Sequence, residues 1–409
     1  MIKPAELENF SQSVRDHLFG HYLPFWSGPA LDHRNGGWMA WLSNDLQPDR
    51  SQPKGLIVNS RILWAFSAVH RVRPEPVYFE MAERAFAVVM NRFWDAAHGG
   101  ACWRLDDAGN VIDDSKKIYG QAFYIYALTE FHRAFGSPAA LDRAKILFAL
   151  VERHAHDARF GCYLEVCRRD WSEAGSEARL SDKDMNEKKS MNNHLHVLEA
   201  YTNLYRVWPE PRVAARLREL IDLFRTRILD VNTKHLHHFF NESWEVRSDT
   251  YTFGHDIEAS WLLVEAAEVL GDAPLLERVR ALALQMAAVV LSEGFDPRGG
   301  LCYEGRAGEI IDPGRECWPQ AEALVGLLNA CEISGNPAFL AAARQTWEFI
   351  ETHLVDRVHG EWFWRINPDG RPEPKLPKVS EWKGPYHATR ACLETLRRLQ
   401  SISSAENSN

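Results

Sequence analysis

An aspartate followed four residues later by glycine, or once by lysine, recurs six times along the chain. Successive aspartates lie 63, 62, 73, 66 and 60 residues apart, so the six units account for nearly all of the 409 residues. A short run rich in aromatic residues follows each motif, as one strand of a hairpin would. Repeats of about 65 residues can each hold two helices and a turn, and each needs neighbours to bury its apolar face. The sequence therefore predicts six helical hairpins closed into a ring around a central cavity. The motifs are Asp32/Gly36, Asp95/Gly99, Asp157/Gly161, Asp230/Lys234, Asp296/Gly300 and Asp356/Gly360.

A second set of six segments alternates with these motifs at a similar spacing. Each begins with polar and aromatic residues and continues with apolar residues at helical spacing. We expect these segments to be the inner helices of a double ring, and the Asp/Gly motifs to precede the outer ones. The polar first turns of the inner helices would converge on the cavity mouth, where free N–H groups and positive helix ends also lie. The segments begin at Asn59, Tyr119, Asn192, Phe253, Trp318 and Tyr386, and clear outer-helix patterns cover Val77–Arg92, Leu141–Val151 and Val213–Ile228.

The repeat also predicts the domain organisation. A chain of this length would by default hold two or three domains. Because each unit depends on its neighbours, we expect one all-α domain over residues 1–400 with short β-hairpin-like loops, followed by a polar, frayed tail at 401–409. The longest irregular segment is 171–189, which directly precedes one inner helix. It is either a lid over the cavity or a solvated surface loop.

Composition excludes several partner classes. The net charge of −9 is spread along the chain, which argues against nucleic acid as a partner. No apolar run approaches the roughly 18 residues that a membrane span needs. The N-terminal residues have no apolar core typical of a signal peptide. Seven cysteines without a C-x-x-C pair indicate reduced thiols, so we expect a cytoplasmic protein. The sequence carries no indication of oligomeric state.

We expect no metal and no cofactor. The seventeen histidines include His194-x-His196 on a predicted helix and a cluster at 235–238 in a predicted hairpin, but neither spacing lets the rings share one ion. The chain has no H-E-x-x-H motif, no Cys/His cluster with ligand spacing and no phosphate-binding glycine loop.

Three histidines occupy matching positions in the repeat. His196, His255 and His387 each lie in or near the first turn of a predicted inner helix, and ring closure would bring them to one cavity. A helix N-terminus favours neutral imidazole, which can act as a base near pH 7. Two such bases on opposite sides of a substrate, with Arg61 and a third histidine beside a developing oxyanion, suit proton abstraction next to a carbonyl. An open-chain aldose has such a carbon at C2.

Five segments together resemble the signature of cellobiose 2-epimerases, a family within the N-acylglucosamine 2-epimerase superfamily. The resemblance spans essentially the whole chain and implies an (α/α)6 barrel, in agreement with the ring predicted from the repeats. It also implies a small-molecule sugar substrate and inversion of C2 in the reducing-end glucose of cellobiose and related β-1,4-linked disaccharides. The proton would leave and return through a cis-enediolate after ring opening. The segments are 59–64 (NSRILW), 191–201 (MNNHLHVLEAY), 253–261 (FGHDIEASW), 318–323 (WPQAEA) and 382–387 (WKGPYH).

The resemblance also implies roles for individual residues. His255 and His387 would be the acid/base pair at C2, His196 would support the C1 oxygen, and Glu258 would orient His255. The remaining sugar contacts would come from Arg61, Asn192, Asp184 and Tyr119, with Trp318 and Trp382 as stacking platforms. Two residues depart from the pattern: Asn193 stands where these epimerases usually have Thr, and Cys317 where relatives often have a second Trp.

Three alternatives stay open at this point. Relatives of these enzymes epimerise free mannose or glucose, or isomerise mannose to fructose. Several glycoside hydrolases share the barrel, but they need two carboxylates that flank the scissile bond. A non-catalytic sugar-binding protein would use the tryptophans without needing three convergent histidines.

Overall fold

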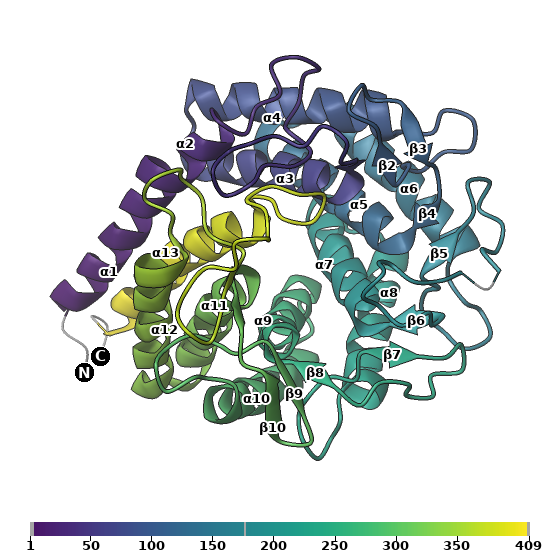
Figure 1. Cartoon of the computed structure of the whole chain (residues 1–409). Helices are drawn as coiled ribbons and strands as arrows, with labels where there is room; N and C mark the ends of the chain where they lie inside the picture. The colour runs from purple at the N-terminus through teal and green to yellow at the C-terminus, as the bar shows by residue number, and fades with distance from the viewer. Residues whose placement is uncertain (1–3, 176, 407–409) are drawn as a thin grey trace.

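The computed structural model describes residues 4–175 and 177–406, in which an inner and an outer ring of helices alternate along the chain (Figure 1). The inner helices are α3 (Leu56–Val72), α5 (Ile118–Phe135), α7 (Met191–Val207), α9 (Phe253–Leu270), α11 (Cys317–Ser334) and α13 (Tyr386–Glu406). The outer helices are α1 (Pro4–His17), α4 (Pro76–Val88), α6 (Pro138–His154), α8 (Pro211–Leu223), α10 (Ala273–Glu293) and α12 (Pro337–Phe349). The predicted (α/α)6 barrel is therefore confirmed.

The outer helices vary in how they end. A π-helical turn extends α1, α4, α8 and α12, and the four-residue helix α2 (Leu23–Trp26) follows the first of these turns. The turns are Leu18–Tyr22, Val89–Phe93, Phe224–Ile228 and Ile350–Leu354. Each Asp/Gly motif directly follows an outer helix and leads into an inner one, so the order that we expected for motifs and helices is wrong.

Burial separates the two rings. Helix α3 buries every residue from Leu56 to Val69, because it has neighbours on all sides. Helix α8 buries only six residues, which recur three or four positions apart and form one apolar face. An apolar stripe on one face therefore indicates an outer helix, whereas burial on all sides is typical of an inner helix.

The ring closes between the two ends of the chain. Helix α13 packs against α11, α3 and α1, so the last helix fills the gap beside the first two (Figure 1). It runs to Glu406, and Ile402 packs against the core. Residues 401–406 of the expected frayed tail are therefore helical, whereas 407–409 lie outside the described residues.

Short strands link neighbouring repeats at the N-terminal ends of the inner helices. A strand just before an inner helix pairs antiparallel with the strand that follows the next Asp/Gly motif. In the sixth position a single bridge between Leu42 and Val379 replaces the strand pair and joins the first repeat to the last. The pairs are β1 (Lys54–Gly55) with β2 (Arg104–Leu105), β4 (Lys116–Lys117) with β5 (Val166–Cys167), β6 (Lys189–Ser190) with β7 (Phe239–Phe240), β8 (Tyr251–Thr252) with β9 (Glu304–Arg306), and β11 (Arg315–Glu316) with β12 (Arg365–Ile366). Strands β3 (Val111–Asp113) and β10 (Glu309–Asp312) extend two of these sheets.

The Asp/Gly motifs are tight turns with a defined chemistry. In each motif the aspartate carboxylate accepts a backbone N–H from within the next three residues, as Asp95 does from Ala97 at 3.0 Å. The residue four positions on has a positive φ, which glycine adopts without strain. Lys234 adopts the same conformation with φ of 67°, which identifies it as the replacement for glycine in the fourth repeat.

A basic residue shortly before an inner helix pairs with the motif aspartate in five of the six repeats. Lys116 and Asp95, with their side chains 0% and 1% exposed, illustrate the arrangement with a distance of 3.1 Å. In the fourth repeat Tyr251 takes this position, and its ring stacks on His235 with centroids 3.5 Å apart. The other pairs are Lys54–Asp32, Lys189–Asp157, Arg315–Asp296 and Lys378–Asp356.

Two further findings concern the residues that the structure describes. No helix among them is long and apolar enough to cross a membrane. The seven cysteines are free thiols, and six of them are buried.

We predict that the buried Lys–Asp pairs are essential for stability. Lys116→Met would leave Asp95 with only the half-exposed Arg169 as a charged partner. Removing one partner of a buried pair costs about 3–5 kcal/mol, and Arg169 places the expected loss near the lower end. Urea unfolding measures this loss, and Lys375→Met on the exposed surface should change stability by less than about 0.5 kcal/mol. Equal stability of the two variants would contradict the prediction.

Candidate active site

A cavity of about 450 Å³ opens at the N-terminal ends of the inner helices. All six inner helices contribute to its wall, as the interleaved repeats predicted. Each of the ten residues proposed from the sequence lines it, whereas their individual roles stay predictions. They are Arg61 on α3, Tyr119 on α5, Asn192 and His196 on α7, His255 and Glu258 on α9, Trp318 on α11 and His387 on α13, together with Asp184 and Trp382 in loops.

The irregular segment 171–189 covers one side of the cavity. Its residues 180–184 belong to the cavity wall, so the lid interpretation is the one that the structure favours. Asp184 stabilises the bend in this segment, because its Oδ2 accepts hydrogen bonds from the amide and hydroxyl of Ser181 at 2.9 and 2.5 Å.

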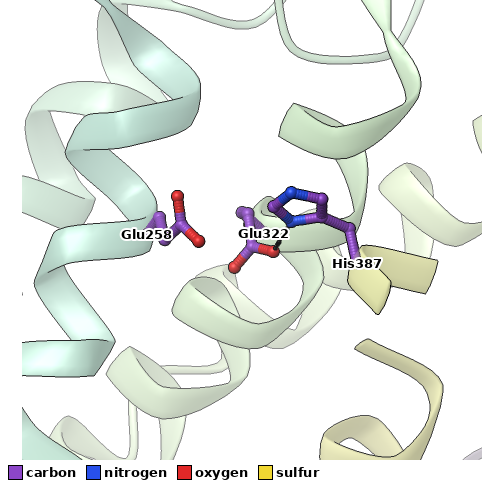
Figure 2. Close-up of side chains that lie close together, drawn as sticks. All are labelled: Glu258, Glu322 and His387. Carbon is purple, nitrogen blue, oxygen red and sulfur yellow. Dashed lines mark hydrogen bonds and ion pairs between the residues drawn. The ribbon is translucent and has the colours of Figure 1, made fainter. Parts of the chain in front are cut away.

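Two of the three histidines are backed by carboxylates. Nδ1 of His387 lies 2.6 Å from Oε1 of Glu322 (Figure 2), and Nδ1 of His196 lies 2.9 Å from Oε2 of Glu199. A carboxylate can only accept a hydrogen bond, so it holds the proton of a neutral imidazole on Nδ1. The lone pair of Nε2 is then free on the other side of the ring.

The third histidine has a different partner from the one that we expected. Nδ1 of His255 lies 2.5 Å from the hydroxyl oxygen of Thr252, while Glu258 bonds through Oε1 to Arg390 at 2.7 Å. The prediction that Glu258 orients His255 is therefore wrong. Residues three apart do share a face of α9, but Arg390 from another helix offers Glu258 a charged partner.

Arg390 is the common partner of three buried glutamates. Its Nη2 donates to Glu258 and to Glu322, each at 2.7 Å, and its Nη1 donates to Glu199. The hydroxyl of Tyr386 bonds to the same oxygen of Glu199. Four inner helices, α7, α9, α11 and α13, thus meet at one guanidinium that is 2% exposed.

Burial keeps the three histidines neutral. It lowers the pKa of His387 to about 4, an effect that Glu322 opposes and that Arg61 and Arg390 reinforce. Burial likewise lowers the pKa of His196 and of His255 well below the usual value. All three rings are therefore neutral near pH 7, as bases must be before they take up a proton.

The three carboxylates share one positive charge, so they cannot all be ionised at low cost. Burial, and then repulsion from Glu322, raises the pKa of Glu258 well above its usual value. Arg390 and the hydrogen bond from His387 instead lower the pKa of Glu322 against the effect of burial. Oε2 of Glu258 is buried without a hydrogen-bond partner among the described residues. These opposite pKa shifts favour a protonated Glu258 and an ionised Glu322.

Glu258, Glu322 and His387 lie close enough to hold a metal ion, with ligand atoms within 4.8 Å of one another (Figure 2). However, Oε1 of Glu322 already bonds to both Arg390 and His387. The guanidinium of Arg390 therefore provides the cation of this cluster, and the donor set does not fit an additional ion.

Aromatic side chains form the remaining walls. The Trp318 ring contacts both His255 and His387, with centroid distances of 4.7 and 5.7 Å. Oε2 of Glu316 accepts from the indole N–H groups of both Trp318 and Trp364. Sequence reasoning missed Trp364, although it placed this residue in the aromatic run after the sixth Asp/Gly motif.

Arg61 joins two other parts of the wall. Its Nη1 donates to the carbonyl of Trp382 at 2.7 Å, and its Nη2 donates to the hydroxyl of Tyr119 at 3.0 Å.

The two residues that depart from the family pattern, Cys317 and Asn193, differ in position. Cys317 lines the cavity, whereas Asn193 is buried outside the wall and donates to the carbonyl of Leu164.

Comparisons with known proteins agree with this geometry. The model of the family described as N-acylglucosamine 2-epimerase (GlcNAc 2-epimerase) matches residues 37–391. The chain is 42% identical to a cellobiose 2-epimerase of Bacteroides fragilis, over 95% of the chain and 99% of the relative. The structure of a cellobiose 2-epimerase from Bacillus thermoamylovorans has a TM-score of 0.91 and 39% identity, covering 96% and 100% of the two chains. A GH76 α-mannanase of Bacteroides thetaiotaomicron, at 12% identity and a TM-score of 0.64 with 98% of each chain covered, shares the fold alone.

We predict that Glu258 is protonated at pH 7. The infrared difference spectrum between the wild type and Glu258→Gln should contain the C=O stretch of a protonated carboxylic acid. The amide of Gln keeps the bond to Arg390, so this variant should lose far less activity than Glu322→Gln, which removes an ionised partner of His387. A difference spectrum without that band, or equal losses in both variants, would contradict the prediction.

Proposed function

The chain belongs to the N-acylglucosamine 2-epimerase family, and we propose that its cavity is the active site of a cellobiose 2-epimerase. Several full-length relatives with this name are 33–42% identical to it. The enzyme inverts C2 of the reducing-end glucose of cellobiose, and gives glucosyl-mannose. The observation that carries this proposal is that two neutral histidines, His255 and His387, line one cavity, where both contact the ring of Trp318.

Ring opening comes first, because C2 becomes acidic only next to a free aldehyde. His196 is proposed to lie beside the C1 oxygen. Its Nδ1 is engaged with Glu199, so its Nε2 can take the C1 hydroxyl proton while the C1–O5 bond breaks and O5 takes up a proton from water. The same N–H then hydrogen-bonds to the oxygen on which negative charge develops in the enediolate.

Proton transfer at C2 follows. One of His255 and His387 removes the C2 proton to form the cis-enediolate, and the other returns a proton to the opposite face. Rotation about the C2–C3 bond would let each histidine reach its own face without movement of the whole sugar. Arg61, Asn192, Tyr119 and Asp184 are proposed to hold the sugar oxygens, with Trp318 and Trp382 as stacking platforms. No step requires a metal or a redox cofactor.

The alternatives differ in substrate or in chemistry. An epimerase or isomerase of free mannose or glucose would use the same histidines, but the relatives cited above favour the disaccharide. A hydrolase needs carboxylates on both sides of the scissile bond. Glu258 and Glu322 bond to the same nitrogen of Arg390, and Glu322 does not line the cavity, which argues against hydrolysis. A cytoplasmic location stays a prediction from the free thiols.

We predict that cellobiose incubated with the enzyme in deuterated water yields a manno-configured reducing end. Reducing-end NMR should show deuterium at C2, since the returned proton exchanges with solvent through a histidine. Free glucose would indicate a hydrolase, and an unchanged spectrum would indicate a binding protein. Epimerisation without deuterium at C2 would require a hydride or retro-aldol route and would overturn the mechanism.

We predict that His255→Ala and His387→Ala each reduce kcat by roughly 10²–10⁴-fold, the usual contribution of a positioned acid or base. His196→Ala should also be severe, through lost support of the C1 oxygen. His98→Ala, on the exposed surface, is the matched control and should retain wild-type turnover. Near wild-type epimerisation by both His255→Ala and His387→Ala would show that the two-histidine assignment is wrong.

A further inference from the structure

Thr252 immediately precedes α9, where the hydroxyl of a threonine commonly accepts an N–H of the first helical turn. Ser190 at the start of α7 follows this rule, because its hydroxyl accepts from the amide of Asn193 at 3.1 Å. The side chain of Thr252 forms no such cap among the described residues. Its hydroxyl oxygen lies instead 2.5 Å from Nδ1 of His255. The hydroxyl is thus diverted from the helix backbone to the imidazole.

The imidazole of His238 contacts both the backbone and the side chain of Thr252. The amide of Thr252 donates to Nε2 of His238 at 3.1 Å, and the same nitrogen lies 3.4 Å from the Thr252 hydroxyl. The backbone of His238 is itself held, since its carbonyl accepts from the amide of Met191 at 2.8 Å and its amide donates to Ser248 at 2.9 Å. His238 therefore connects the start of α7 to the start of α9.

The direction of these hydrogen bonds follows from the groups that they must satisfy. An amide can only donate, so Nε2 of His238 carries a lone pair rather than a proton. The Thr252 hydroxyl can share this lone pair with the amide through its longer contact of 3.4 Å, and its oxygen then accepts from His255 Nδ1–H. The reverse arrangement would leave the hydroxyl oxygen without a donor among the residues that the structure describes, and Thr252 is only 5% exposed. Buried polar groups without partners are costly, so the first arrangement is favoured.

We propose that Thr252 and His238 are positioning residues that hold His255 as the Nδ1–H tautomer, with the bare Nε2 toward the cavity. Glu322 imposes the same tautomer on His387, so both histidines present a base to the substrate. A hydroxyl can do this for His255 without placing a fourth carboxylate in a cluster that has one guanidinium. The tautomer is independent of the reaction, whereas its effect on turnover rests on the proposed epimerisation.

The tautomer can be read directly by long-range ¹H–¹⁵N NMR of the histidine side chains, with His255 assigned by the loss of its signals in His255→Gln. The wild type and Thr252→Ser, which keeps the hydroxyl, should both show His255 protonated at Nδ1. Thr252→Val has nearly the same shape without the hydroxyl and should give a mixture of tautomers. A wild-type His255 protonated at Nε2, or an unchanged tautomer in Thr252→Val, would overturn the proposal.

Kinetics on cellobiose provide the second readout. Losing the hydrogen-bond partner of a metal-bound histidine typically costs 10–100-fold, and by analogy kcat of Thr252→Val should fall by roughly this factor with little change in KM. Thr252→Ser should recover most of the loss. His238→Leu should resemble Thr252→Val, whereas His238→Gln keeps an acceptor near the position of Nε2 and should recover activity. Wild-type kcat in both Thr252→Val and His238→Leu would refute the role. A wild-type enzyme that does not epimerise cellobiose would refute the proposed function and leave the tautomer result standing.

Discussion

The arrangement of the active site depends on one buried guanidinium shared by three carboxylates. Arg390 comes from the last inner helix and bonds to glutamates from three others, so it fixes the relative positions of α7, α9, α11 and α13. The same contacts determine protonation, because one positive charge cannot support three negative ones in a buried site. Glu199 and Glu322 then orient the two histidines that they contact. The interaction that ties these four helices together is thus also the one that sets the tautomers of His196 and His387.

The six-fold repeat explains why these groups meet at all. Each inner helix begins directly after a short strand that pairs with the neighbouring repeat, so the six N-terminal ends lie at one end of the barrel. Polar side chains from the first turns of different inner helices, such as Asn192, His255 and His387, can therefore meet in the same cavity. The buried Lys–Asp pairs hold the strands and the Asp/Gly turns together without contacting the cavity. The features common to the repeats thus build the barrel, and the residues that differ between repeats form the active site.

The ring, the inner helices and the convergence of the three histidines could be predicted from period and position, whereas wall residues such as Asp184 and Trp382 came from the family resemblance. The contacts between helices could not. Glu258 lies three residues after His255, and a single helix makes them neighbours, but the charge of Arg390 on a distant helix competes successfully for Glu258. The N-terminal position of Thr252 likewise suggests a helix cap, and only the three-dimensional structure shows its hydroxyl on His255. Trp364 was missed because its aromatic run was assigned to the hairpin and not to the cavity.

The two proposed proton-transfer histidines differ in a way that bears on the reaction. Glu322 contacts His387 directly, and its negative charge stabilises an imidazolium at His387 once this ring takes up a proton. Nδ1 of His255 contacts a neutral hydroxyl, and burial together with the imidazoles of His238, His196 and His387 lowers its pKa. A proton on His255 is therefore held less tightly than one on His387. His387 is thus the stronger base, and protonated His255 is the stronger acid. This difference arises from the hydrogen-bond partner of Nδ1 in each histidine.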